Sequence, residues 1–183
     1  RIPLKPGNIR LIGMRSLFGI AGMLSYFTVV ENLQLSEAVT INRLSPFFVL
    51  IFARIFLGER MRRAQIAAMI TAFAGVAVIL RPVAVQISFQ SALALLSAVF
   101  AGAAYTTLRG LRSTDRPLVV VFWFSMIMSL VFLPGLLSTG VVPDGGALVK
   151  LLCIGLFGAS GQLLMTSAYR YAPGGKVAIY GYI

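Results

Sequence analysis

Histidine is absent from this sequence, and cysteine occurs once, as Cys153. The commonest metal ligand and the usual catalytic base are therefore missing, and no intrachain disulfide can form. Acidic residues number only five, and none of them lies deep in an apolar run. We accordingly predict no metal, no cofactor and no carboxylate relay of the kind that couples many carriers to protons.

Charge is scarce as well, because 11% of the 183 residues are charged whereas 58% are hydrophobic. A soluble domain averages about a quarter charged residues, so this chain could not cover itself with a solvated surface. We predict an integral membrane protein that is located in the cell membrane, specifically in the inner membrane of a bacterium. Its net charge of +11 comes from short basic clusters between apolar runs, which suit loops beside anionic lipid and argue against nucleic acid as a partner.

Apolar runs recur along the whole chain, and about 20 such residues cross a hydrocarbon core of about 30 Å. Six complete runs and the beginning of a seventh predict membrane-spanning helices at residues 11–30, 38–57, 64–80, 91–108, 118–137, 147–168 and 177–183. The predicted fold is thus an all-α, multi-pass helical bundle. Because the chain starts with Arg1 and stops inside an apolar run, we expect it to be a piece of a longer protein.

Basic residues are distributed unevenly between the two sets of alternate loops. Thirteen of the sixteen lysines and arginines fall in one set, and only Arg81 and Lys150 fall in the other. The thirteen are Arg1, Lys5, Arg10, Arg15, Arg54, Arg60, Arg62, Arg63, Arg109, Arg112, Arg116, Arg170 and Lys176. Loops rich in lysine and arginine stay in the cytoplasm, so the first set is predicted to be cytoplasmic. The remaining arginine, Arg43, lies inside the second run.

The second run with its flanks, residues 36–59, contains the most unusual residues of the chain. Asn42, Arg43 and Pro46 lie well inside it, although a spanning helix tolerates such residues only where they face protein or water. Pro46 has no N–H to donate to the carbonyl of Asn42, so we predict a bent helix with a free carbonyl near the membrane centre. The alternative is a structural kink whose polar groups are satisfied by neighbouring helices.

Arg43 admits three interpretations. It could bind an anionic group of a solute, pair with Glu31 or Glu37 near the outer end of the helices, or extend its long side chain outward to the lipid headgroups. Together with Asn42 and Pro46, it is predicted to be a substrate-binding residue.

A shift of 136 residues superimposes residues 19–39 on residues 155–175. Glycines coincide at two positions of this alignment, and Tyr26 coincides with Gln162. By the charge argument the two copies enter the membrane from opposite sides, as an inverted-topology repeat requires. Tyr26 and Gln162 are therefore predicted substrate-binding residues at the interface between the repeats, with hydrogen bonds between helices as the alternative.

Two stretches of the chain, residues 35–82 and 155–178, carry a family pattern. Its features here are the Ser45–Pro46 pair, the Gly58–Glu59 loop, Gly75 and the turn YRYAP at residues 169–173. In these features the chain resembles the EamA-like family of the drug/metabolite transporter superfamily. Ala68 departs from the pattern, because the family usually has glycine there, which affects the spacing of helices.

The resemblance implies ten helices in two inverted five-helix repeats, of which this chain would supply helices three to eight and the start of nine. Residues 1–82 would be the end of the first EamA repeat, and residues 83–183 would belong to the second. It also implies a carrier of small metabolites, since members of the family often export amino acids or related compounds.

We predict a secondary transporter that moves a small organic metabolite, amino-acid-like or otherwise anionic, by alternating access. The solute and the lipid bilayer are its predicted partners, and the oligomeric state is left open, with a homodimer as one option. A membrane-embedded enzyme is the first rival, but it would need an acid/base or metal constellation that this chain lacks. A non-transporting membrane scaffold is the second rival, and it would not need a polar, proline-broken centre in its second span.

Overall fold

The computed structural model describes residues 8–32, 34–60, 63–80, 89–111, 116–140, 143–172 and 177. Within these ranges the chain forms seven helices and no strand. The helices are α1 (Ile9–Asn32), α2 (Leu35–Asn42), α3 (Ser45–Leu57), α4 (Arg63–Leu80), α5 (Phe89–Leu111), α6 (Pro117–Thr139) and α7 (Gly145–Tyr171). The predicted all-α fold is confirmed.

Five segments of the described chain are long and apolar enough to cross a membrane. They are α1, the combined α2 and α3 (Leu35–Leu57), α5, most of α6 (Pro117–Ser138) and α7. Helix α4 has 18 residues and occupies the third predicted run. The predicted multi-pass bundle is therefore confirmed, whereas the predicted seventh run lies, apart from Val177, outside the described residues.

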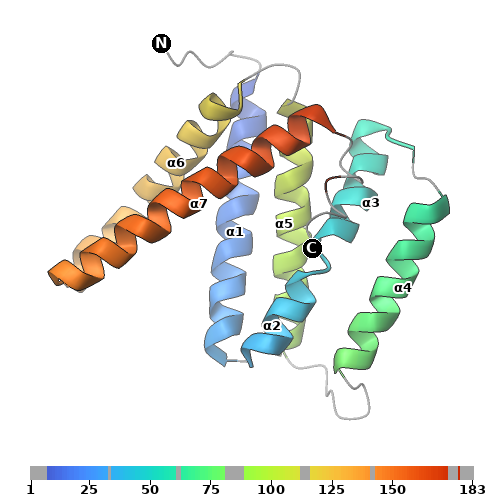
Figure 1. Cartoon of the computed structure of the whole chain (residues 1–183), viewed down its shortest axis with the longest axis horizontal. Helices are drawn as coiled ribbons and strands as arrows, with labels where there is room; N and C mark the ends of the chain where they lie inside the picture. Colours follow the sequence, from blue (N-terminus) through green and yellow to red (C-terminus); the bar gives the residue numbers. More distant parts are fainter. Residues whose placement is uncertain are drawn as a thin grey trace.

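When α4 is counted with these five segments, consecutive segments alternate in direction (Figure 1). Helix α1 begins, and α3, α5 and α7 end, at the same end of the bundle, at the top of Figure 1. We call this the basic end, because Arg10, Arg109 and Arg170 lie in the helix turns found there. All three belong to the basic set that was predicted to share one side of the membrane, so the helix directions agree with the charge pattern.

Helix α5 is the centre of the packing, because α1, α2, α3 and α7 all contact it (Figure 1). Glycines let the helix backbones approach closely. A Cβ atom added at Gly22 of α1 would lie 3.3 Å from the Cβ of Phe100, and one added at Gly102 would lie 3.1 Å from the carbonyl oxygen of Ser45. The lack of a side chain at Gly22 and Gly102 thus sets how closely α1 and α3 lie against α5.

The second predicted span is two helices rather than one. Helix α2 ends at Asn42, and α3 begins at Ser45 with Pro46 as its second residue. Pro46 cannot donate to the carbonyl of Asn42 and its ring crowds that carbonyl, whereas at the start of a new helix its missing N–H costs nothing. The predicted bend is therefore confirmed, and it takes the form of a two-residue turn at Arg43 and Leu44, whose N–H groups still donate to the carbonyls of Val39 and Ile41 at 3.0 Å.

Helix α3 ends in a left-handed turn at Gly58, whose φ is 65°. Glycine adopts this conformation without steric cost. The N–H of Glu59 then donates to the carbonyl of Ala53 at 3.2 Å, which closes the last turn of the helix. The turn leaves Glu59 at the basic end, beside α5.

Two hydrophobic clusters hold the bundle together, one towards each end. The basic-end cluster consists of Ile12, Val49, Leu108, Leu111, Val120, Tyr169 and Val177. The opposite cluster consists of Val29, Ala38, Ile41, Leu44, Phe47, Ala94 and Ala98. Between them lies the middle of the bundle, where polar residues such as Arg15, Ser97 and Gln162 are found.

Candidate functional site

Polar side chains occupy the space between the two hydrophobic clusters. Along α1, Arg15 and Tyr26 lie between Ile12 of the basic-end cluster and Val29 of the opposite cluster. They line a cavity of about 260 Å³, which we call the central cavity and to which α2, α5, α6 and α7 also contribute. Its polar lining residues are Arg15, Tyr26, Asn42, Ser97, Tyr105 and Gln162.

A smaller cavity of about 190 Å³ adjoins the central one, because Asn42 and Tyr105 line both. We call it the adjacent cavity. Its lining residues are Asn42, Arg43, Ser45, Pro46, Tyr105, Met165, Tyr169 and Val177. The break between α2 and α3 therefore forms one wall of the adjacent cavity.

All five residues predicted to bind substrate line one of these two cavities. Tyr26, Asn42 and Gln162 line the central cavity, although they come from α1, α2 and α7. Asn42, Arg43 and Pro46 line the adjacent cavity. The side chain of Arg43 is exposed and is not part of the central cavity wall. The structure thus brings the five residues together, while their role in binding stays a prediction.

Asn42 is held in place by α5. Its Nδ2 atom donates a hydrogen bond to Ser97 Oγ at 3.1 Å. The hydroxyl of Ser97, which is fully buried, in turn donates to the carbonyl of Ala94 at 2.7 Å. This chain of hydrogen bonds fixes the last residue of α2 at the wall shared by the two cavities.

Arg15 is a site residue that the sequence interpretation missed. Its side chain is only 4% exposed, and its Nη2 atom donates to Gln162 Oε1 at a long 3.4 Å. The guanidinium carbon lies 4.1 Å from the ring centre of Phe124 and 5.8 Å from that of Tyr105. The sequence counted Arg15 among the basic residues that flank the first span. The sequence did contain one indication that Arg15 lies inside the span, because several apolar residues of the predicted run precede it.

A second group that the sequence did not predict lies at the basic end. Arg109, which is 5% exposed, forms an ion pair with Glu59, with 2.7 Å between Nε and Oε1. Its Nη1 atom donates to the carbonyl oxygens of Tyr169 at 3.1 Å and Ala172 at 2.7 Å. Arg109 therefore ties the ends of α3, α5 and α7 together. Because Tyr169 also lines the adjacent cavity, this basic-end network lies directly beside that cavity.

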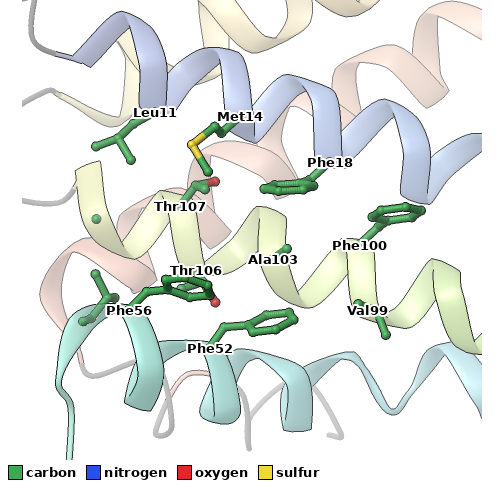
Figure 2. Close-up of a pocket in the computed structure, with 12 residues that line it drawn as sticks. Leu11, Met14, Phe18, Phe52, Phe56, Val99, Phe100, Ala103, Thr106 and Thr107 are labelled. Atoms are coloured by element: carbon green, nitrogen blue, oxygen red, sulfur yellow. The ribbon is translucent and has the colours of Figure 1, made fainter.

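A third pocket, about 440 Å³ and larger than the two cavities described above, has a different chemistry (Figure 2). It lies between α1, α3 and α5, and rings such as those of Phe18, Phe52 and Phe100 line it. The hydroxyls of Thr106 and Thr107 donate to carbonyls of their own helix, so they are already engaged. This pocket suits apolar contacts and offers little to recognise a polar solute.

The central cavity suits an organic molecule better than a metal ion. Among the residues that the structure describes, no group of three or more acidic, cysteine or histidine side chains could hold a metal. The cavity instead offers one guanidinium, two carboxamides and three hydroxyls. A mostly apolar wall with a few convergent polar groups is typical of sites for small organic ligands.

Comparison with known proteins places the chain in a family. The profile of the EamA-like transporter family matches residues 1–81 and 89–183. The pseudopaline exporter CntI of Pseudomonas aeruginosa is 30% identical over 187 residues, which cover all of this chain and 65% of the exporter. A riboflavin transporter of Rhizobium johnstonii is 30% identical over 89% of this chain and 54% of its own length.

A more distant relative is the human solute carrier family 35 member G1, which is 29% identical over 91% of this chain and 50% of its own length. The chain thus spans between half and two thirds of the length of these relatives. No solved structure gives a significant match. Since the family profile covers nearly every residue, and since the helical bundle and its polar centre fit a membrane carrier, the chain belongs to the EamA-like transporter family.

Proposed function

We propose that the full-length protein is a secondary transporter that moves a small organic metabolite across the cell membrane by alternating access. The proposal concerns the whole protein, because this chain spans only 65% of the pseudopaline exporter. The observation that carries it is the central cavity, where polar side chains from α1, α2 and α7 converge between two hydrophobic clusters. Polar groups inside a membrane bundle are costly and typically mark the path of a solute.

We infer that residues 1–82 end the first inverted repeat and that residues 83–183 belong to the second. The two separate matches of the family profile, to residues 1–81 and 89–183, support this division. Tyr26 and Gln162, which coincide when the chain is shifted on itself, line the same cavity. Their meeting supports a binding site at the interface between the repeats, near the middle of the membrane.

The solute that fits best is a small, amino-acid-like or otherwise anionic metabolite. The central and adjacent cavities, about 260 and 190 Å³, are each smaller than the roughly 300–1,000 Å³ typical of ligand pockets, which favours a small solute. Relatives named as a pseudopaline exporter and a riboflavin transporter support an organic solute and a carrier rather than an enzyme. We place the basic end in the cytoplasm by its charge. A homodimer remains a prediction.

Counterflow in proteoliposomes tests this function on the full-length protein, with amino acids, 2-oxo acids and riboflavin as the solute panel. We expect Asn42→Ala and Gln162→Ala to raise the apparent KM of the transported solute up to about 10-fold, because each variant removes a hydrogen bond from the cavity. Arg54→Gln is the matched control, since Arg54 is exposed and lines neither cavity. A folded protein that exchanges no member of the panel, or cavity variants that behave like Arg54→Gln, would contradict the proposal.

A further inference from the structure

The charged side chain of Arg15 lies in the interior of the bundle. It lies six residues from the start of α1, which corresponds to about 9 Å along the helix axis. Its side chain is 4% exposed, and it lines the central cavity. A buried arginine is costly unless an opposite charge or a full set of acceptors compensates it.

The described residues provide little such compensation. Gln162 is neutral and accepts from Nη2 at 3.4 Å, near the limit for a hydrogen bond. The Nε atom of Arg15 is buried and has no hydrogen-bond partner. The carboxylate of Glu59 forms an ion pair with Arg109 at the basic end. The rings of Phe124 and Tyr105 attract the cation but supply no negative charge.

The backbone of α1 is shaped around this guanidinium. A Cβ atom added at Gly19 would lie 2.8 Å from Arg15 Nη1 and 2.8 Å from the ring of Phe124. The missing side chain at Gly19 therefore leaves room for the guanidinium to lie between α1 and the aromatic ring of α6. This arrangement holds Arg15 in one orientation, with Nη2 directed towards Gln162 on α7.

We propose that Arg15 binds a carboxylate group of the transported solute inside the central cavity. The inference rests on the proposed transport function and specifies the chemical class of the solute. The planar edge formed by Nε and Nη2 matches a carboxylate, which would replace the weak acceptor Gln162 with two charge-assisted hydrogen bonds. A phosphate fits less well, because it carries up to two negative charges and Arg15 is the single cation among the residues described in the central cavity wall.

The first test measures ligand binding to purified full-length protein by its thermal shift. The probes are amino acids and 2-oxo acids, each compared with its carboxamide, in lipid nanodiscs made of either phosphatidylcholine or phosphatidylglycerol. We expect at least one carboxylate to stabilise the protein in both lipids and its amide to fail. No stabilisation by any carboxylate, equal stabilisation by acid and amide, or an effect of phosphatidylglycerol alone would overturn the proposal. The last of these outcomes would assign Arg15 to a lipid phosphate.

The second test compares variants in binding of the carboxylate found in this way. Arg15→Gln should weaken its apparent affinity by about 30-fold or more, because one partner of a buried charge pair is lost. Arg15→Lys should weaken it less, since it keeps the charge and loses the planar edge. Arg54→Gln, at an exposed position outside both cavities, should bind as the wild type does.

The two proposals can fail separately. If Arg15→Gln lowers the melting temperature but leaves the carboxylate affinity unchanged, Arg15 is only a link between helices and the carboxylate site is refuted. A neutral solute transported equally by the wild type and by Arg15→Gln would refute the carboxylate site and leave the transport function standing. Carboxylate binding without any counterflow would refute the transport function and leave the carboxylate site standing.

Discussion

At the scale of single residues, two arginines inside the predicted spans lie in different surroundings. Arg43, which the sequence favoured as the binding residue, is exposed and faces the adjacent cavity. Arg15 is buried at the central cavity because Phe124 and Gln162 pack against it. Gln162 is 147 positions further along the chain, and a single sequence does not reveal such a neighbour. Burial of a charge depends on packing partners, which local residue patterns do not contain.

Glycine at position 102 should be required for stability. In the full-length protein Gly102→Ala is expected to destabilise the fold by about 1–3 kcal/mol, because the new methyl group would press against Phe48 and the Ser45 carbonyl on α3. Gly155→Ala is the control, since a Cβ atom there would meet no atom within 4 Å. Thermal unfolding in detergent measures both variants. Equal melting temperatures for the two variants would contradict the close packing of α3 on α5.

At the scale of elements, the sequence predicted the helices well and their interruptions less well. The described helices occupy the predicted apolar runs, because apolar run length alone determines what can cross a bilayer. The sequence also located the disturbance at Pro46, since a proline without an N–H must weaken a helix. It could not show that α2 and α3 would be separate helices joined by a turn at Arg43 and Leu44, nor that Asn42 beside this turn would donate a hydrogen bond to Ser97 of α5.

Pro46→Ala tests the break between α2 and α3. Alanine restores the missing N–H and favours a continuous helix, which would draw Asn42 away from Ser97 and straighten the wall of the adjacent cavity. We expect near-normal abundance in the membrane and a counterflow rate several-fold lower, on the order of 1 kcal/mol in the barrier. Quantitative blotting and initial counterflow rates of the full-length protein measure the two effects.

Pro134→Ala provides the comparison for Pro46→Ala. Pro134 also lies inside a spanning helix, α6, but it is exposed and outside both cavities. Its replacement should leave the transport rate unchanged. Equal rates for the two proline variants would reduce Pro46 to a packing feature.

At the scale of the whole molecule, the basic-end network closes the bundle beside the adjacent cavity. The guanidinium of Arg109 joins the ends of three helices through Glu59, Tyr169 and Ala172. Alternating access requires that helices separate at one end while they close at the other. Separation at the basic end therefore requires these hydrogen bonds to break together.

Arg109→Gln should open the basic end more often. With Met165→Cys as a reporter in the adjacent cavity and Cys153→Ala as background, we expect a membrane-impermeant thiol reagent to label the cavity several-fold faster from the cytoplasmic side. A lost buried ion pair of about 1–2 kcal/mol corresponds to roughly a 5- to 30-fold change in the open population. Arg63→Gln, which removes an exposed charge at the same end, should leave the labelling rate unchanged.

A second reporter checks the orientation in the same experiment. Cysteine in place of Pro143, in the loop before α7, should react only from the side opposite to the basic end. Unchanged labelling of Met165→Cys in the Arg109→Gln protein would refute the closing role of the network. Labelling of position 143 from the cytoplasmic side would instead refute the alternation of the spans.

The turn at Gly58 has a consequence for the kinetics of the proposed transport cycle. Glu59 reaches Arg109 because the chain reverses at a φ of 65°, and any other residue would adopt that angle with strain. The strength of the basic-end network is therefore set partly by one backbone torsion, at a position beyond the last residue of α3. In the proposed transport cycle, the dwell time of the closed state is therefore set in part by Gly58, which lines neither the central nor the adjacent cavity.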